Sequence, residues 1–117
     1  MTMHELGIAK SVLEAVCGEA SKHAGARVVK VGLRVGELAG VDPDALQFSF
    51  ECLVKDTPLD PLPLEIEFCP RQQRCPACEH AFCVADYETS CPKCGAASTE
   101  CIGGTELEFS YLELEET

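Results

Sequence analysis

Apolar and polar positions along this chain follow two different periods, and each change of period marks an element. From Glu5 to Ala24, apolar residues recur every three or four positions, which predicts an amphipathic helix. Residues 27–35 are rich in β-branched side chains, with apolar residues at every second position from Val29, and predict a strand. Asp42-Pro43, an N-cap followed by a proline suited to the first turn, begins a second predicted helix that ends near Lys55.

The second half of the chain contains two further strand patterns. A proline-rich stretch, residues 57–63, predicts a loop, and after it apolar residues alternate with glutamates from Leu64 to Phe68, as in a strand with one buried face. The last run, residues 107–114, is also strand-like. Its final leucines, Leu112 and Leu114, are out of phase with the apolar residues before them, so we expect a bulge or a change of buried face.

A cysteine-rich segment, residues 69–101, separates these last two strands. The order of elements predicts an α+β fold: a small sheet of about three strands with two helices, and an inserted four-cysteine module resembling a zinc ribbon. We expect residues 1–70 to form an α/β domain that the C-terminal strand, residues 103–117, completes. Residues 71–102 then form a separate zinc-binding domain.

Two Cys-x-x-Cys pairs give the inserted segment its chemistry. They are Cys75-Pro76-Ala77-Cys78 and Cys91-Pro92-Lys93-Cys94. Paired knuckles of this spacing supply four thiolates in a tetrahedron, the arrangement typical of structural zinc. Iron in a rubredoxin-like cage is the closest chemical rival, although Glu79 follows the first knuckle where that motif has glycine. His80 is an alternative ligand, whereas Cys17 and Cys52 lie in predicted helices and are expected to be buried.

Composition excludes several classes of function. The net charge of −11, from 20 acidic and 9 basic residues, disfavours binding to nucleic acid. No apolar stretch reaches the roughly 20 residues that a membrane-spanning helix needs. Nine cysteines without an export signal indicate metal ligation in a reducing cytoplasm. The chain has no catalytic triad or phosphate-binding glycine loop, and a closed four-cysteine site leaves no place for water, so we expect no catalytic residues and no enzyme activity.

The N-terminus carries a second candidate metal site. His4 lies close to the terminal amine, and an amine, backbone amides and an imidazole together form a nitrogen-rich planar set that suits Ni(II) or Cu(II) better than Zn(II). A histidine near a terminus is more often simply solvated, so position alone does not decide.

Several motifs together resemble a known family. In chain order they are Met3-His4-Glu5-Leu6-Gly7-Ile8-Ala9, Val35-Gly36-Glu37-Leu38-Ala39-Gly40-Val41, Ala45-Leu46-Gln47-Phe48, the two knuckles, and Gly104-Thr105-Glu106-Leu107. With this order and this cysteine spacing, the chain resembles the HypA/HybF family of nickel metallochaperones over nearly its whole length. The resemblance implies a protein that helps deliver nickel to the precursor of the [NiFe]-hydrogenase large subunit, with a HypB-type GTPase as partner, and that in some organisms also serves urease maturation proteins.

The resemblance also assigns the ligands. It implies that His4 and Glu5, with Met3, contribute to a site for transferable Ni(II), and that the thiolates of Cys75, Cys78, Cys91 and Cys94 hold structural Zn(II). Members of the family begin Met-His-Glu, whereas Met1-Thr2 precede that motif here. We expect tight nickel binding if the mature chain starts at Met3 or Thr2, and weaker binding if Met1 is retained.

Two questions stay open at the level of sequence. The rival to a nickel carrier is a zinc-ribbon adaptor that binds protein partners and has no nickel role. The oligomeric state, monomer or homodimer, is not fixed by any pattern in the chain.

Overall fold

The computed structural model describes the backbone of residues 2–116 and the side chains of residues 4–116. The described chain divides into two compact units. Unit 1 comprises the residues up to Arg34, Val41–Glu67 and the chain from Glu108 onward, and unit 2 comprises Val35–Gly40 and Phe68–Leu107. The short segment Val35–Gly40 therefore groups with the cysteine-rich part, although its first two residues are the end of a strand that begins in the α/β part.

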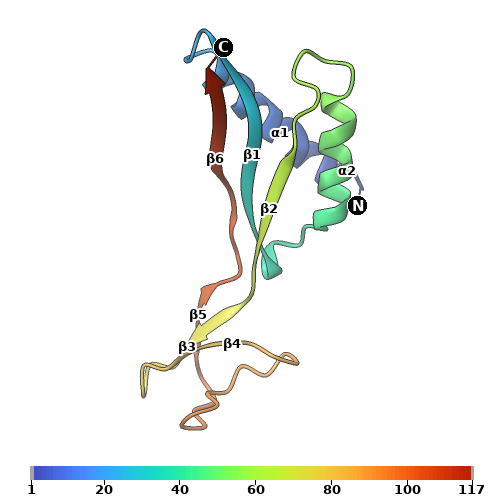
Figure 1. Ribbon diagram of the computed structural model, residues 1–117. Coiled ribbons are helices and arrows are strands. Elements are labelled where there is room, and N and C mark those ends of the chain that lie inside the picture. The colour runs from blue at the N-terminus through green and yellow to red at the C-terminus, as the bar shows by residue number, and fades with distance from the viewer. Residues whose placement is uncertain (1, 117) are drawn as a thin grey trace. The chain divides into compact units, whose positions relative to one another are not determined.

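Unit 1 is built on a three-stranded sheet with two helices. Its elements are α1 (Thr2–Ala20), β1 (Ala26–Gly36), α2 (Pro43–Val54), β2 (Leu64–Cys69) and β6 (Leu107–Glu116). The strand order is β2-β1-β6. Figure 1 shows β1 and β2 running in the same direction and β6 running against them, with α1 behind the sheet. These elements, with the inserted four-cysteine segment, confirm the predicted α+β fold class.

The core of unit 1 lies between the helices and one face of the sheet. Val31 and Leu33 of β1 are buried, as the alternation along this strand predicts. The buried helical residues recur at helical spacing: Ala9, Val12 and Val16 of α1, and Leu46, Phe50 and Val54 of α2. Burial of these side chains, each of which contributes roughly 1 to 3 kcal/mol, is the main force that holds unit 1 together.

The ends of α1 differ from the prediction of a helix over residues 5–24. The helix begins at Thr2 and ends at Ala20. Beyond it, the amide of Lys22 donates to the Glu19 carbonyl and the amide of His23 to the Ala20 carbonyl, which are the tighter bonds of a terminating turn. Gly25 then takes a φ of 88°, which reverses the chain into β1. None of the helices in the described part of the chain is long and apolar enough to cross a membrane.

The opposite face of the sheet is polar and carries a network of ion pairs. Arg34 of β1 lies 2.8 Å from Glu108 of β6 and 3.7 Å from Glu67 of β2. The ring of Tyr111 covers Gly32, where a Cβ atom would lie 2.1 Å from the ring. Because only glycine leaves room for this aromatic ring, Gly32 and Tyr111 are matched across β1 and β6.

Strand β6 changes its buried face, as its out-of-phase leucines predict. Phe109 lies beside Ala15 and Gly18 of α1, whereas Tyr111 covers Gly32 on the other face of the sheet. Residues two positions apart in a regular strand share a face, so an irregularity falls between these two aromatic residues.

Unit 2 contains a second three-stranded sheet and a short 3-10 helix. Its elements are η1 (Glu37–Ala39), β3 (Gln72–Arg74), β4 (Ala81–Cys83) and β5 (Glu100–Gly103). The strand order is β4-β3-β5, and both pairs are antiparallel. Backbone hydrogen bonds of 2.6 Å join Gly36 to Glu106 and Leu38 to Gly104. A Cβ atom on Gly36 would lie 2.2 Å from the carbonyl oxygen of Gly104, so this close backbone approach requires glycine.

Two cysteines contradict the prediction that they are buried. Cys17 of α1 and Cys52 of α2 are both exposed. Cys17 follows the buried Val16 by one position, and Cys52 follows the buried Phe50 by two. Because a helix rotates by about 100° per residue, both thiols point away from the core.

Candidate metal centres

The four knuckle cysteines come together at one point of unit 2. The Sγ atoms of Cys75, Cys78, Cys91 and Cys94 all lie within 4.8 Å of one another. Two of the separations are 3.5 Å, from Cys75 to Cys94, and 3.6 Å, from Cys78 to Cys91. A tetrahedron with Zn–S distances of about 2.3 Å has edges of about 3.8 Å, so the quartet has the size of a four-thiolate zinc cage.

Both knuckles are shaped by the same set of backbone hydrogen bonds. In the first, the Cys75 amide donates to the His80 carbonyl at 2.9 Å and the Glu79 amide donates to the Cys75 carbonyl at 2.7 Å. In the second, the corresponding bonds join Cys91 to Ala96 and Gly95 to Cys91, both at 2.9 Å. The residue after each Cys-x-x-Cys motif is left-handed, with a φ of 63° at Glu79 and 81° at Gly95.

Local hydrogen bonds separate the pKa values of the thiols. The backbone amide of Cys78 lowers the pKa of Cys75 although burial opposes the shift. Burial by itself raises the pKa of Cys91, but the amides of Cys94 and Lys93 and the neighbouring thiols outweigh it and bring the value to about 6. The amide of Ala96 lowers the pKa of Cys94, yet contact with the other three sulfurs raises it to about 11. The quartet thus holds both a stabilised thiolate and a proton that a bound cation must displace.

His80, the alternative ligand considered from the sequence, and the other cysteines of unit 2 lie outside this cluster. Among the described residues, His80 is not one of the side chains gathered here, and its ring instead stacks on Phe82 with centroids 6.0 Å apart. Cys69 is buried elsewhere in unit 2, while Cys83 and Cys101 are exposed. The quartet therefore forms a closed set, which fits a structural metal such as zinc.

The N-terminal candidates lie on the first turns of α1. His4 is half exposed, at 51%, whereas Glu5 is buried, at 3%. The Nδ1 atom of His4 lies 3.7 Å from the Oε2 atom of Glu5. The third residue proposed from the sequence for this site, Met3, has a side chain that lies outside the described residues.

The buried Glu5 carboxylate has a partner that the sequence did not reveal. Its Oε2 atom accepts a hydrogen bond of 3.2 Å from the backbone amide of Asp42, the N-cap of α2. The side chain of Asp42 in turn accepts bonds from the amides of Asp44 and Ala45. The motif at Asp42-Pro43 predicts a helix start, but nothing local predicts that Glu5 serves the same helix end from the other side.

The geometry defines a class of protein: a small α+β protein with a tetrahedral four-thiolate centre and an exposed histidine beside a buried carboxylate at its N-terminus. Residues 3–114 match the family model described as "Hydrogenase/urease nickel incorporation, metallochaperone, hypA". The chain belongs to this HypA family.

Curated relatives support the same assignment. The chain is 41% identical over 113 residues to the hydrogenase maturation factor HypA of Geobacter metallireducens, an alignment that spans 97% of this chain and 100% of that protein. It is 42% identical over 115 residues to the hydrogenase maturation factor HypA of Roseiflexus, spanning 97% of this chain and 94% of the relative.

Solved structures share the fold. The solution structure of the Ni metallochaperone HypA from Helicobacter pylori superposes with a TM-score of 0.63 at 20% identity, covering 97% of this chain and 98% of that one. A second solution structure of a HypA protein gives a TM-score of 0.70 at 23% identity, with 97% of each chain covered. At these identities the likeness concerns the fold.

Proposed function

We propose that this protein is a nickel metallochaperone that binds Ni(II) near its N-terminus and helps deliver it to the precursor of the [NiFe]-hydrogenase large subunit. Nickel is a transferable cargo, and zinc in the cysteine quartet is a permanent structural ion. The protein itself catalyses no reaction, and delivery takes place in the cytoplasm. The observation that carries the proposal is the pairing of an exposed imidazole with a buried carboxylate, 3.7 Å apart, in a chain of the HypA family.

The two ends of the proposed nickel site have different roles. His4 is accessible to solvent, as a ligand must be if its ion is to be handed over. Glu5 is held in place by the Asp42 amide, so its carboxylate reaches the metal from a fixed position. The terminal amine and the backbone amides around Met3 complete the nitrogen-rich set that Ni(II) prefers.

The proposed partners follow from the family. We expect a HypB-type GTPase and the hydrogenase large-subunit precursor to bind this chain, and urease maturation proteins where the host makes urease. The family description names both hydrogenase and urease, and the curated relatives are named for hydrogenase maturation.

Substitution of His4 by alanine tests the nickel role. We expect His4→Ala to weaken Ni(II) binding by about tenfold or more, the loss of roughly 1.4 kcal/mol or more for one strong ligand. Isothermal titration of the zinc-loaded protein measures the affinity, and elemental analysis checks that zinc content is unchanged. His23→Ala, at an exposed position after α1, is the matched control and should bind nickel like the parent.

The outcomes separate the two functions considered from the sequence. A carrier loses nickel affinity only in the His4 variant. If His4→Ala and His23→Ala bind nickel equally well, the N-terminal site is wrong and the zinc-ribbon adaptor is favoured. Titrating chains that start at Met1, Thr2 and Met3 then tests the terminal amine, since equal affinity in all three would remove the amine from the ligand set.

A further inference from the structure

Strand β6 forms one edge of the sheet in unit 1. In the order β2-β1-β6, only β1 pairs with it among the described strands. The second row of amide and carbonyl groups on an edge strand can pair with another chain. Over Leu107–Glu116, β6 thus offers a long template for an added strand.

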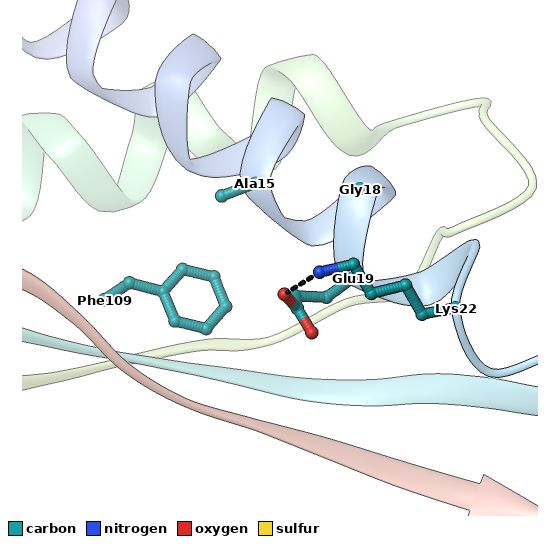
Figure 2. A pocket seen from close by; sticks show the side chains of 5 residues that line it. All are labelled: Ala15, Gly18, Glu19, Lys22 and Phe109. Atoms are coloured by element: carbon teal, nitrogen blue, oxygen red, sulfur yellow. Dashed lines mark hydrogen bonds and ion pairs between the residues drawn. The ribbon is translucent and has the colours of Figure 1, made fainter.

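A groove lies beside this strand, against α1. It is lined by Ala15, Gly18, Glu19, Lys22 and Phe109, and its volume is about 360 Å³. Figure 2 shows Ala15 and Gly18 on α1 across from the Phe109 ring, and the Glu19 carboxylate, paired with Lys22, pointing toward that ring. The atoms of that pair are 3.2 Å apart, so the pair adds no net charge to the groove. The interior of the groove is apolar and suits aliphatic side chains.

The glycine in this groove has no packing reason within the protein. A Cβ atom on Gly18 would have nothing within 4 Å, and Gly18 is in the regular part of α1. Glycine inside a helix costs about 0.5 to 1 kcal/mol relative to alanine. The bare backbone at this position therefore keeps the groove open at a cost in helix stability.

The other face of the same strand lies on the ion-paired face of the sheet, where glutamates outnumber the basic residues. Glu113 is exposed, and Glu108 and Glu115 remain 52% and 61% exposed although Arg34 and Arg27 contact them. Glu113 also acts electrostatically on Tyr111, which lies on the polar face of the sheet. Successive side chains of an added strand would point to opposite faces of the sheet. Every second side chain would lie beside these carboxylates, and the side chains between them would point toward the groove.

We propose that the free edge of β6 and the groove beside it bind an extended segment of a partner protein in which basic and apolar residues alternate. The basic side chains would face the glutamates of β6, and the apolar side chains would enter the groove against Phe109. A second copy of this chain is disfavoured as occupant, because its own β6 would bring like charges to the same face. This inference is independent of the nickel role.

A synthetic peptide of ten residues that alternates lysine and valine tests the proposal on the zinc-loaded protein without nickel. We expect it to perturb the amide resonances of β6 and of residues 15–22 of α1. Two control peptides have the same length: one with glutamate in place of lysine, and one whose edge-facing amides are N-methylated. We expect both to bind at least about tenfold more weakly, since one loses the charge match and the other the strand pairing.

A pair of glycine substitutions shows whether the groove takes part. Gly18→Leu fills the groove and should weaken binding of the peptide by about tenfold. The fold should stay intact, because the new side chain meets open space. Gly7→Leu is the matched control, since Gly7 also lies in α1 with nothing within 4 Å of a Cβ atom but does not line the groove. Equal binding by the two variants, or equal binding of the lysine and glutamate peptides, would overturn the proposal, as would self-association of the protein through β6 in place of peptide binding.

Discussion

The two units of this protein differ in what stabilises each of them internally. In unit 1, the buried side chains between α1, α2 and the sheet are apolar, and Leu46 and Phe50 are completely inaccessible. In the stretch Phe68–Leu107 of unit 2, the buried residues are cysteines, glycines and one glutamine: Cys69, Gln73, Cys75, Cys91, Gly103 and Gly104. Unit 1 is therefore stabilised mainly by the hydrophobic effect, whereas unit 2 has little apolar core in this stretch, and we expect its stability to depend on a metal in the cysteine quartet and on backbone hydrogen bonds.

This difference predicts that the cysteine-rich unit needs a metal ion in order to fold. A segment of this size buries too little apolar surface to offset its loss of conformational entropy. The buried Gln73 fits this account, because its amide donates to the Thr99 hydroxyl at 3.0 Å, so a polar contact stands where a larger core would have an aliphatic side chain. The binding energy of the metal then supplies the folding energy.

Removing zinc should have the largest effect. We expect a strong chelator to unfold unit 2, because metal binding contributes on the order of 10 kcal/mol to sites of this type, and to leave the helices of unit 1 folded. Hydrogen exchange followed residue by residue before and after chelation measures this. Cys75→Ser should act like the chelator, and Cys101→Ser, at an exposed cysteine outside the quartet, should not. If both units lost their protection from hydrogen exchange together, the conclusion that different forces stabilise them would be wrong.

A core substitution in unit 1 should have the opposite effect: it should destabilise unit 1 and leave the zinc site of unit 2 intact. Phe50 is fully buried, and Phe50→Ala is expected to lower the free energy of unfolding by about 3 to 5 kcal/mol through lost burial and a cavity. Urea denaturation of the zinc-loaded protein measures this, with the zinc content unchanged. Phe48→Ala on the same helix is the control, because Phe48 is 69% exposed and its loss should change stability by less than about 0.5 kcal/mol.

The polar face of the sheet should show a pH dependence at high pH. The Tyr111 hydroxyl donates to Glu65, and this bond, with burial and the nearby carboxylates, raises the pKa of Tyr111 to about 12. Since the folded protein keeps the proton that the unfolded chain loses near pH 10, stability falls as the pH rises from 10 towards 12. In a Tyr87→Phe background, absorbance at 295 nm should show Tyr111 still mostly protonated at pH 11. Complete ionisation at that pH would contradict the hydrogen bond.

The smallest expected effect concerns the two knuckles. Glu79 occupies the left-handed position that Gly95 occupies in the second knuckle, and for a residue with a side chain this conformation costs about 1 kcal/mol. Glu79→Gly should therefore tighten zinc binding by a few-fold. The substitution also removes the exposed ion pair between Glu79 and Arg74, but the loss of that pair should reduce the gain only slightly. Competition with a chromophoric chelator measures the affinity. Gly95→Ala should weaken zinc binding, and a change in the same direction for both variants would rule out backbone strain as the cause.

Local patterns in the sequence were sufficient for the helices and strands of unit 1, apart from the ends of α1, and for the cysteine quartet, but they did not predict η1 or the short strands β3, β4 and β5. The period of the apolar residues reports which side chains of a helix or strand share a face, so α2 could be placed from its own residues. For β2 the prediction of one buried face is only partly right, because Leu64 is buried but Phe68 is 53% exposed. The spacing of the four cysteines reports ligand geometry in the same local way. The exposure of Cys17 and Cys52 shows the limit, because a cysteine is small and apolar enough to be tolerated on either side of a helix.

Contacts between distant residues could not be predicted. Nothing near Glu5 indicates that its carboxylate accepts a hydrogen bond from Asp42, and nothing near Gly32 indicates that the ring of Tyr111 will cover it. The grouping of Val35–Gly40 with unit 2 likewise depends on bonds to Gly104 and Glu106. Such contacts depend on the tertiary arrangement, and hydrophobic periodicity gives no information about it.

The bonds that tie Gly36 and Leu38 to residues near the end of the chain have a consequence for synthesis on the ribosome. The segment Val35–Gly40 emerges early, but its backbone partners Gly104 and Glu106 are translated much later. The same holds for β1, one of whose two neighbours in the sheet is the final strand. The bonds of Gly36 and Leu38 and the pairing of β1 with β6 can therefore form only after residues 104–116 have left the ribosome, whereas the local bonds of α1, α2 and the knuckles can form earlier.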